Sequence, residues 1–109
     1  MPKKDNLAYL FDIRECILRI ERFTEGIASF DQYEKDEKTI NAVERQLSII
    51  GEAVIQYTKL EKLENAEKIR GFRNRLIHSY DSIEQEMVWV IIKRHLPPLL
   101  EEVTKKLPS

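Results

Sequence analysis

A basic run between positions 69 and 80 holds the residue types best suited to chemistry. No acidic residue interrupts this run. Its polar side chains, apart from one serine, are three arginines, an asparagine, a histidine and a tyrosine: Arg70, Arg73, Arg75, Asn74, His78 and Tyr80. Histidine has the unperturbed pKa that suits proton transfer near neutral pH, and arginine carries a permanent planar cation whose donors match phosphate oxygens. This combination favours acid–base chemistry on a phosphate group.

The spacing within this run predicts two faces on one helix. At about 100° per residue, Arg73 and Tyr80 share one face, whereas Asn74 and His78 share another. Arg73 and His78 then point about 140° apart, so they do not face each other within one straight helix. Either the helix unwinds near His78, where the serines and aspartate that follow favour turns, or a two-fold dimer brings the two faces together.

The elements that must position this run are expected to be helices. The chain has three glycines, four prolines and no alternating strand pattern. Apolar residues three and four positions apart predict a first helix that ends near Gly26. The same spacing predicts a second helix over residues 40–57, packed along another long helix. Gly51 lies in its middle, where a glycine costs about 1 kcal/mol relative to alanine, and so is expected to mark the close approach of a neighbour.

The second half of the chain predicts two more helices and a dimer. A third helix is expected to carry the basic run, and Asp81 or Ser82 is expected to cap the last long helix. Residues 87–92 are so apolar that part of this helix is expected to pack on a second subunit. Pro97 and Pro98 are predicted to break it. The expected fold is all-α: an up-and-down four-helix bundle with a short C-terminal helix, forming a two-fold homodimer.

Length and charge narrow the possible functions. The 109 residues suit a single helical domain, and 18 Lys and Arg against 19 Asp and Glu give a net charge of -1. Such a chain does not bind nucleic acid indiscriminately, so any contact with it must be local. The first residues lack the apolar run of a signal peptide, and no stretch approaches the length needed to span a bilayer. We therefore expect a cytoplasmic protein with no membrane contact.

Several other reactive residues are assigned mainly to structural roles. Cys16, among apolar neighbours, is expected to be a buried small hydrophobe rather than a nucleophile. His95, beside Lys93 and Arg94, is expected at the surface. No metal site is predicted, because neither histidine has ligand-like partners. Glu52 is expected either to pair with the arginines inside the bundle or, less simply, to act in catalysis itself.

The basic run resembles the arginine-x4-histidine-x-tyrosine signature of HEPN domains, and its Arg-Asn form resembles the HepT-like ribonuclease toxins. Arg73-Asn74, three further residues and then His78-Ser79-Tyr80 carry this match. Other blocks resemble the same family, so that the likeness spans most of the chain: residues 41–47, 50–53, 89–92 and 96–99. The connection over residues 58–68 is shorter than in many family members.

The resemblance implies an endoribonuclease toxin that cleaves RNA without a metal or cofactor. The ribose 2′-hydroxyl would attack the adjacent phosphate, a step that needs proton transfer and charge stabilisation. Arg73 and His78 are expected to be catalytic, with Asn74 orienting the histidine or the substrate. Arg70 and Arg75 are expected to bind flanking phosphates of the RNA. A composite cleft at the dimer interface would bring the catalytic groups together.

The resemblance also implies a partner. In the family, a minimal nucleotidyltransferase acts as the antitoxin of the toxin–antitoxin pair and attaches AMP to the tyrosine that Tyr80 matches. The simpler interpretation of Tyr80 is that it packs against Leu76 and caps the helix. For the whole protein, the alternative is a non-catalytic HEPN module that binds a nucleotidyltransferase or nucleic acid and cuts nothing.

Overall fold

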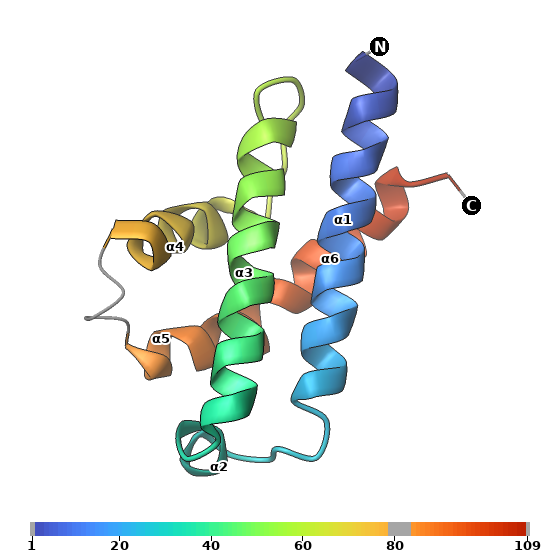
Figure 1. The fold of residues 1–109 in the computed structure, drawn as a ribbon. Helices are drawn as coiled ribbons and strands as arrows, with labels where there is room; N and C mark the ends of the chain where they lie inside the picture. The colour runs from blue at the N-terminus through green and yellow to red at the C-terminus, as the bar shows by residue number, and fades with distance from the viewer. Residues whose placement is uncertain (1, 79–83, 109) are drawn as a thin grey trace.

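The computed structural model describes residues 2–78 and 84–108, with side chains described for residues 6–73 and 84–108. Every regular element in these ranges is helical, so the all-α prediction is confirmed for them (Figure 1). The elements are α1 (Pro2–Phe23), α2 (Phe30–Glu34), α3 (Glu37–Tyr57), α4 (Glu67–His78), α5 (Gln85–Val90), the π-helical η2 (Ile91–His95) and α6 (Leu96–Lys106). None of the described helices is long and apolar enough to cross a membrane.

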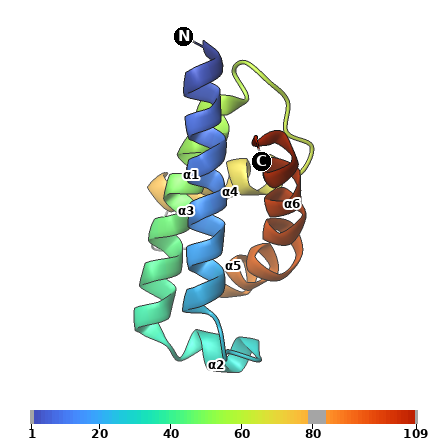
Figure 2. The same cartoon turned by 90° about the vertical axis from the view of Figure 1, so that its right-hand side faces the viewer.

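The long helices α1 and α3 lie side by side and run in opposite directions (Figures 1 and 2). The chain turns between them at Gly26, whose φ of 84° is a left-handed conformation that suits glycine. Asp36 caps α3, because its carboxylate accepts hydrogen bonds from the Thr39 amide at 3.1 Å and the Thr39 hydroxyl at 2.7 Å. These bonds lower the pKa of Asp36. The predicted second helix is therefore confirmed, with a defined start.

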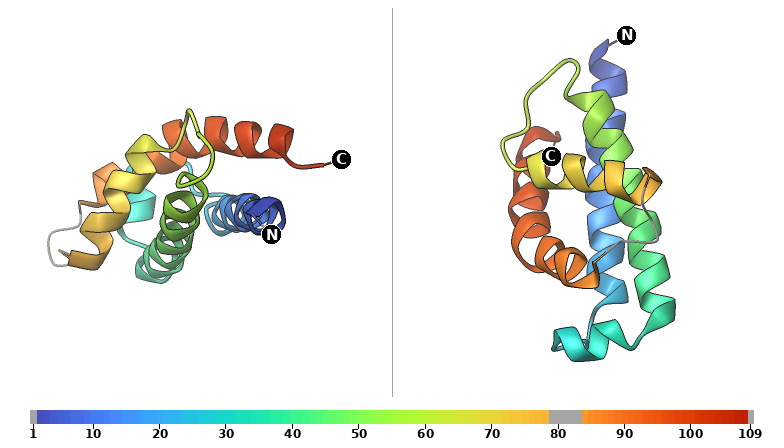
Figure 3. Two further views of the ribbon diagram at one scale, coloured as in Figure 1. Left: turned by 90° about the horizontal axis from the view of Figure 1, so that it is seen from above. Right: turned by 90° about the vertical axis from the view of Figure 1, so that its left-hand side faces the viewer.

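A second layer covers one side of this pair. Seen from above, α4 and α6 lie on the same side of α1 and α3 (Figure 3). In two views α4 crosses α3 steeply and does not run along it (Figures 1 and 3). The expected up-and-down four-helix bundle is therefore not confirmed.

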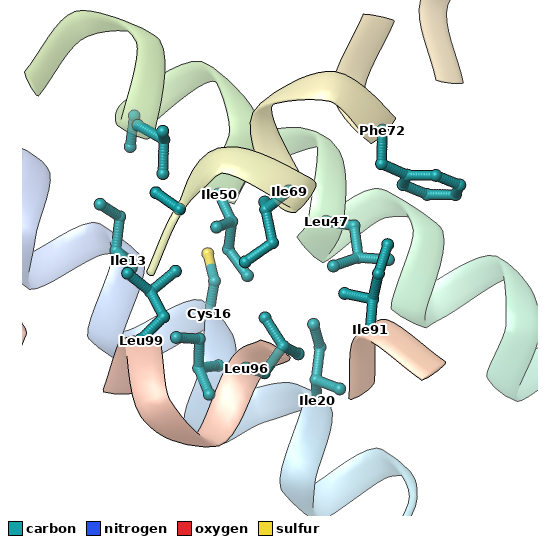
Figure 4. Packing of buried hydrophobic residues seen from close by; sticks show 14 of the residues in the cluster. Ile13, Cys16, Ile20, Leu47, Ile50, Ile69, Phe72, Ile91, Leu96 and Leu99 are labelled. Atoms are coloured by element: carbon teal, nitrogen blue, oxygen red, sulfur yellow. The ribbon is translucent and has the colours of Figure 1, made fainter. Parts of the chain in front are cut away.

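One core fills the space between the two layers. Buried side chains of α1, α3, α4, η2 and α6 point toward one another there (Figure 4). Fully buried members include Ile13, Ile17, Ile20, Leu47, Ile50, Ile69, Leu96 and Leu99. Burial of each such side chain contributes about 1.5–3 kcal/mol to folding. Cys16 lies in this core, and burial raises the pKa of its thiol, so the expectation of a buried small hydrophobe is confirmed.

The last helical segment differs from the prediction at its prolines. Its N-cap residue is Glu84, which forms no capping side-chain hydrogen bond, and the predicted caps Asp81 and Ser82 lie outside the described residues. Pro97 and Pro98 do not break the segment, because they lie in the first turn of α6, where a missing N–H loses no helical hydrogen bond. The five-residue π-helical stretch η2 joins α5 to α6 just before the prolines. The wider turn lets the chain stay helical while it curves around the core (Figure 2).

The apolar run over residues 87–92 is mostly covered by its own chain. Val88, Ile91 and Ile92 are buried. The half-buried Trp89 packs against Tyr33, with ring centroids 5.3 Å apart. Val90 is the exposed member, at 41%. Most of the apolar surface of this run is therefore covered within one chain, and packing of this helix on a second subunit stays a prediction.

The charged connection before α4 is fixed to α6. The Glu102 carboxylate accepts hydrogen bonds from the backbone amides of Glu64, at 2.8 Å, and Asn65, at 3.0 Å. The side-chain amide of Asn65 donates a third bond at 3.0 Å. Leu63 and Ala66 are buried beneath this point. The start of α4, and hence the helix that carries the basic run, is positioned by α6.

Candidate catalytic face of α4

Helix α4 turns its apolar side to the core and its basic side outward. Ile69 and Phe72 are buried, whereas Arg70 is exposed and Arg73 is half-buried. The amphipathic pattern therefore leaves the basic residues at the surface of the second layer. Of the candidate residues, Arg70 and Arg73 have described side chains. The side chains of Asn74, Arg75 and His78, and all of Tyr80, lie outside the described residues.

Arg73 lies across α3 at Gly51. A Cβ built on Gly51 would overlap the Cβ and Cγ of Arg73 and come within 3.6 Å of its Cα. The prediction that Gly51 marks a close approach is confirmed, and the neighbour is a candidate catalytic residue. The missing side chain at Gly51 lets α4 cross near enough for the stem of Arg73 to rest on α3.

Arg73 also forms an ion pair with the residue after that glycine. Its Nη2 lies 3.1 Å from the Glu52 Oε2, so the predicted pairing of Glu52 with an arginine is confirmed. The Arg73 side chain is 23% exposed and that of Glu52 is 53% exposed, so solvent screens the pair and its contribution to stability is small. The Arg73 Nε is buried and has no described hydrogen-bond partner. The pair orients the guanidinium while leaving donors for another acceptor.

The backbone of α4 bears on how Arg73 and His78 can meet. The helix continues through His78, which is its last residue, so it does not unwind before the histidine. A regular helix between the two positions directs their Cβ atoms about 140° apart. The residues that follow His78 lie outside the described ranges, so unwinding near the histidine and a two-fold dimer both stay predictions.

Arg70 borders a separate hollow of about 440 Å³ at the end of α3. The hollow is lined by the connection to α4, including Lys59 and Lys62, and by Glu61 and Glu67. Within the described part of the chain, Arg70 has no carboxylate within ion-pair distance. It lies three residues before Arg73, so the two point about 60° apart on α4. An extended phosphate chain can reach both.

The remaining reactive residues give no second catalytic cluster. Among the described residues, no group of three or more His, Cys, Asp or Glu side chains could hold a metal ion. His95 is half-buried in η2, not fully at the surface as expected, and it borders a hollow together with Lys68. Sequence reasoning misses Lys68, because one lysine in a charged first turn carries no signal of its own.

We expect Gly51→Ala to destabilise the protein by about 1–3 kcal/mol, because the new methyl group would overlap the stem of Arg73. This loss exceeds the gain of about 1 kcal/mol from better helix propensity. Urea unfolding measures it. Gly71→Ala in α4 is the matched control, since a Cβ there would have nothing within 4 Å, and it should instead stabilise the protein. Equal stabilisation by both changes would contradict the close packing of Arg73 on α3.

Comparisons with known proteins cover nearly the whole chain. A family model described as Ribonuclease HepT-like matches residues 13–106. The "Putative RNase MJ0127" of Methanocaldococcus jannaschii is 37% identical over 94% of this chain and 88% of its own length. The "Probable ribonuclease HepT" of Thermococcus cleftensis is 36% identical over 89% of this chain and 91% of its own. No solved structure gives a significant match.

Proposed function

Because this chain belongs to the ribonuclease HepT-like family and is an endoribonuclease, we propose that it cleaves RNA without a metal ion, as the toxin of a toxin–antitoxin pair. The observation that carries the proposal is the placement of Arg73 at the crossing of α3 and α4, inside the matched residues. There the guanidinium pairs with Glu52 while the side chain stays 23% exposed, and a guanidinium has five donors, of which the ion pair does not use all.

The proposed reaction needs one proton removed and one proton supplied. A base takes the proton of the ribose 2′-hydroxyl, and the 2′-oxygen bonds to the adjacent phosphorus. The bond from phosphorus to the 5′-oxygen then breaks, an acid protonates that oxygen, and a 2′,3′-cyclic phosphate and a 5′-hydroxyl remain. His78 suits the proton transfer and Arg73 suits the negative charge that develops on the phosphate. Asn74 would orient the histidine or the substrate.

The direction of α4 supports a composite site. One chain offers His78 as a single suitable base or acid, five positions after Arg73 on one helix, where regular helical geometry sets the two positions about 140° apart. A two-fold axis beside α4 would set the Arg73 of one protomer against the His78 of the other and would supply a second histidine. Arg70 and Arg75 would then hold RNA on either side of the scissile phosphate.

We expect the protein to be a dimer in solution, with twice the 12.9 kDa mass of one chain. The reason is the composite site, since the apolar run of residues 87–92 is mostly covered within one chain. Static light scattering at micromolar concentration measures the mass. A monomer that still cleaves RNA would contradict the composite site.

We expect cleavage of RNA to persist in excess chelator, because the proposed step uses a histidine and an arginine in place of a metal. Purified protein is incubated with single-stranded and structured RNA in the chelator, and the products are analysed for cyclic-phosphate and 5′-hydroxyl ends. Cleavage that stops in chelator and returns with magnesium would contradict the proposal. Binding of RNA without any cleavage would favour the non-catalytic HEPN module instead.

A further inference from the structure

A hollow on the outer side of α4 lies apart from the Arg73 crossing. It consists of two adjoining parts, of about 580 Å³ and 190 Å³, that share Lys68 and Met87. Gly71 and Phe72 of α4 line the wider part, and His95 lines the narrower one. We call this the α4–α5 hollow. It runs along α4 and ends at the π-helical segment.

Gly71 is unexplained by the packing of the residues whose side chains are described. A glycine inside a helix costs about 1 kcal/mol relative to alanine. Gly51 has a clear reason, because Arg73 occupies the space of its missing side chain. A Cβ on Gly71 would meet nothing within 4 Å, and the residue is exposed in the hollow. A glycine that keeps bare backbone at an open surface allows another molecule to approach that backbone closely.

The hollow lies on the face of α4 that leads to His78. His78 lies seven positions after Gly71, which brings the two positions to the same side of the helix, about 10 Å apart along its axis. Arg75 lies four positions after Gly71, about one turn farther along α4. A strand of RNA whose scissile phosphate lies at His78 can therefore continue along α4 into the hollow.

The chemistry of the lining suits one nucleotide. Lys68 and His95 supply donors at the narrow end, and neither has an ion-pair partner among the residues whose side chains are described. Val90, which is exposed, and the half-buried Met87 give an apolar surface beside them. Glu67 lines only the wider part, so the cationic end is the one nearest η2. Sites for single-stranded RNA combine such cations for phosphates with apolar surface for bases.

We propose that the α4–α5 hollow binds a nucleotide of the RNA substrate next to the cleaved one. Gly71 lets the ribose-phosphate backbone approach α4, and Lys68 binds its phosphate. The donors of Lys68 and His95 at the narrow end, which Glu67 does not line, favour RNA as the occupant over a second copy of this chain. The inference rests on the proposed ribonuclease function, because it assigns the scissile phosphate to His78.

The test uses the full chain and compares Gly71→Ala and Lys68→Gln with Lys105→Gln, an exposed lysine on α6 outside the hollow. Binding of a fluorescent single-stranded RNA is measured by anisotropy in a His78→Ala background, and KM for cleavage is measured with His78 intact. We expect Kd and KM to rise about tenfold for the first two changes and to stay unchanged for Lys105→Gln. Gly71→Ala should remain folded, since its methyl group meets open space.

The outcomes separate this inference from the proposed function. If the wild type cleaves RNA and both variants keep its Kd and KM, the hollow is not an RNA subsite. The ribonuclease proposal would then still hold. No binding and no cleavage by the wild type would overturn both. If Gly71→Ala turned a dimer into a monomer by light scattering, the hollow would be an interface between two copies, and the RNA subsite would again be overturned.

Discussion

His78→Ala is expected to lower the rate of RNA cleavage by about 10²- to 10⁴-fold, because a positioned proton-transfer group contributes that much to such a step. The histidine is the last residue of α4, so its loss should leave the helix and the core intact. Single-turnover cleavage of a labelled RNA gives the rate, and circular dichroism and light scattering check the fold and the mass. Equal cleavage by wild type and His78→Ala would indicate a contaminating ribonuclease and favour the non-catalytic module.

Arg73 needs a more careful substitution, because its stem packs on Gly51. Arg73→Ala should abolish most of the activity but would also leave a gap between α3 and α4. Arg73→Lys keeps the stem and the positive charge and loses the planar guanidinium, so a loss of activity with retained stability would assign the effect to phosphate recognition. Glu52→Gln is the companion variant. It removes the ion-pair partner and keeps Arg73, and full loss of activity in Glu52→Gln would instead favour a direct catalytic role for Glu52.

The α3 helix shows how much local pattern can predict. Its apolar spacing predicted a helix over residues 40–57, and Gly51 predicted the close approach of a neighbour. Both are confirmed, because the pattern and the packing act on the same stretch of chain. The identity of the neighbour was not predictable, since it depends on the steep crossing of α4, which joins residues far apart in sequence.

The C-terminal segment shows where local pattern fails. Two adjacent prolines at positions 97 and 98 ordinarily end a helix, and the apolar run before them suggested a surface for a second subunit. The π-helical turn over Ile91–His95 bears on both. After this turn, the two prolines lie in the first turn of α6. The turn also curves the helical segment so that Ile91, Ile92 and Leu96 face the core. No residue type marks a π turn, so tertiary packing decides it.

The residues of the candidate site could be predicted from the sequence, but their arrangement in space could not. Residue types and resemblance singled out Arg73 and His78, and both lie inside the range that the family model matches. Helix α4 runs unbroken from Arg73 to His78, and the side chain of His78 lies outside the described residues. A site that a second protomer completes cannot be predicted from the pattern of one helix. The position of a two-fold axis produces no periodic pattern in the sequence.

We propose that a nucleotidyltransferase partner controls this site by modifying Tyr80. An AMP group on its hydroxyl would place a negative phosphate near the arginines of α4, satisfying cations that otherwise hold RNA, and would fill the cleft with a base and a ribose. Tyr80 follows the proposed base His78 by two positions in the sequence. The modified protein should therefore bind and cleave RNA poorly.

We expect the protein to gain one or more AMP units per chain when it is mixed with its cognate nucleotidyltransferase, ATP and magnesium, and to lose RNA cleavage in proportion. Intact-mass spectrometry measures the gain, and peptide mapping should place the label on Tyr80. Tyr80→Phe is the matched control and should gain nothing while it remains active and uninhibited. Tyr33 is fully buried, and its burial and the nearby Glu44 raise the pKa of its hydroxyl, so it should stay unlabelled. An unmodified wild type, or a label on another residue, would show that Tyr80 packs and caps α4 and that control of the ribonuclease takes another route.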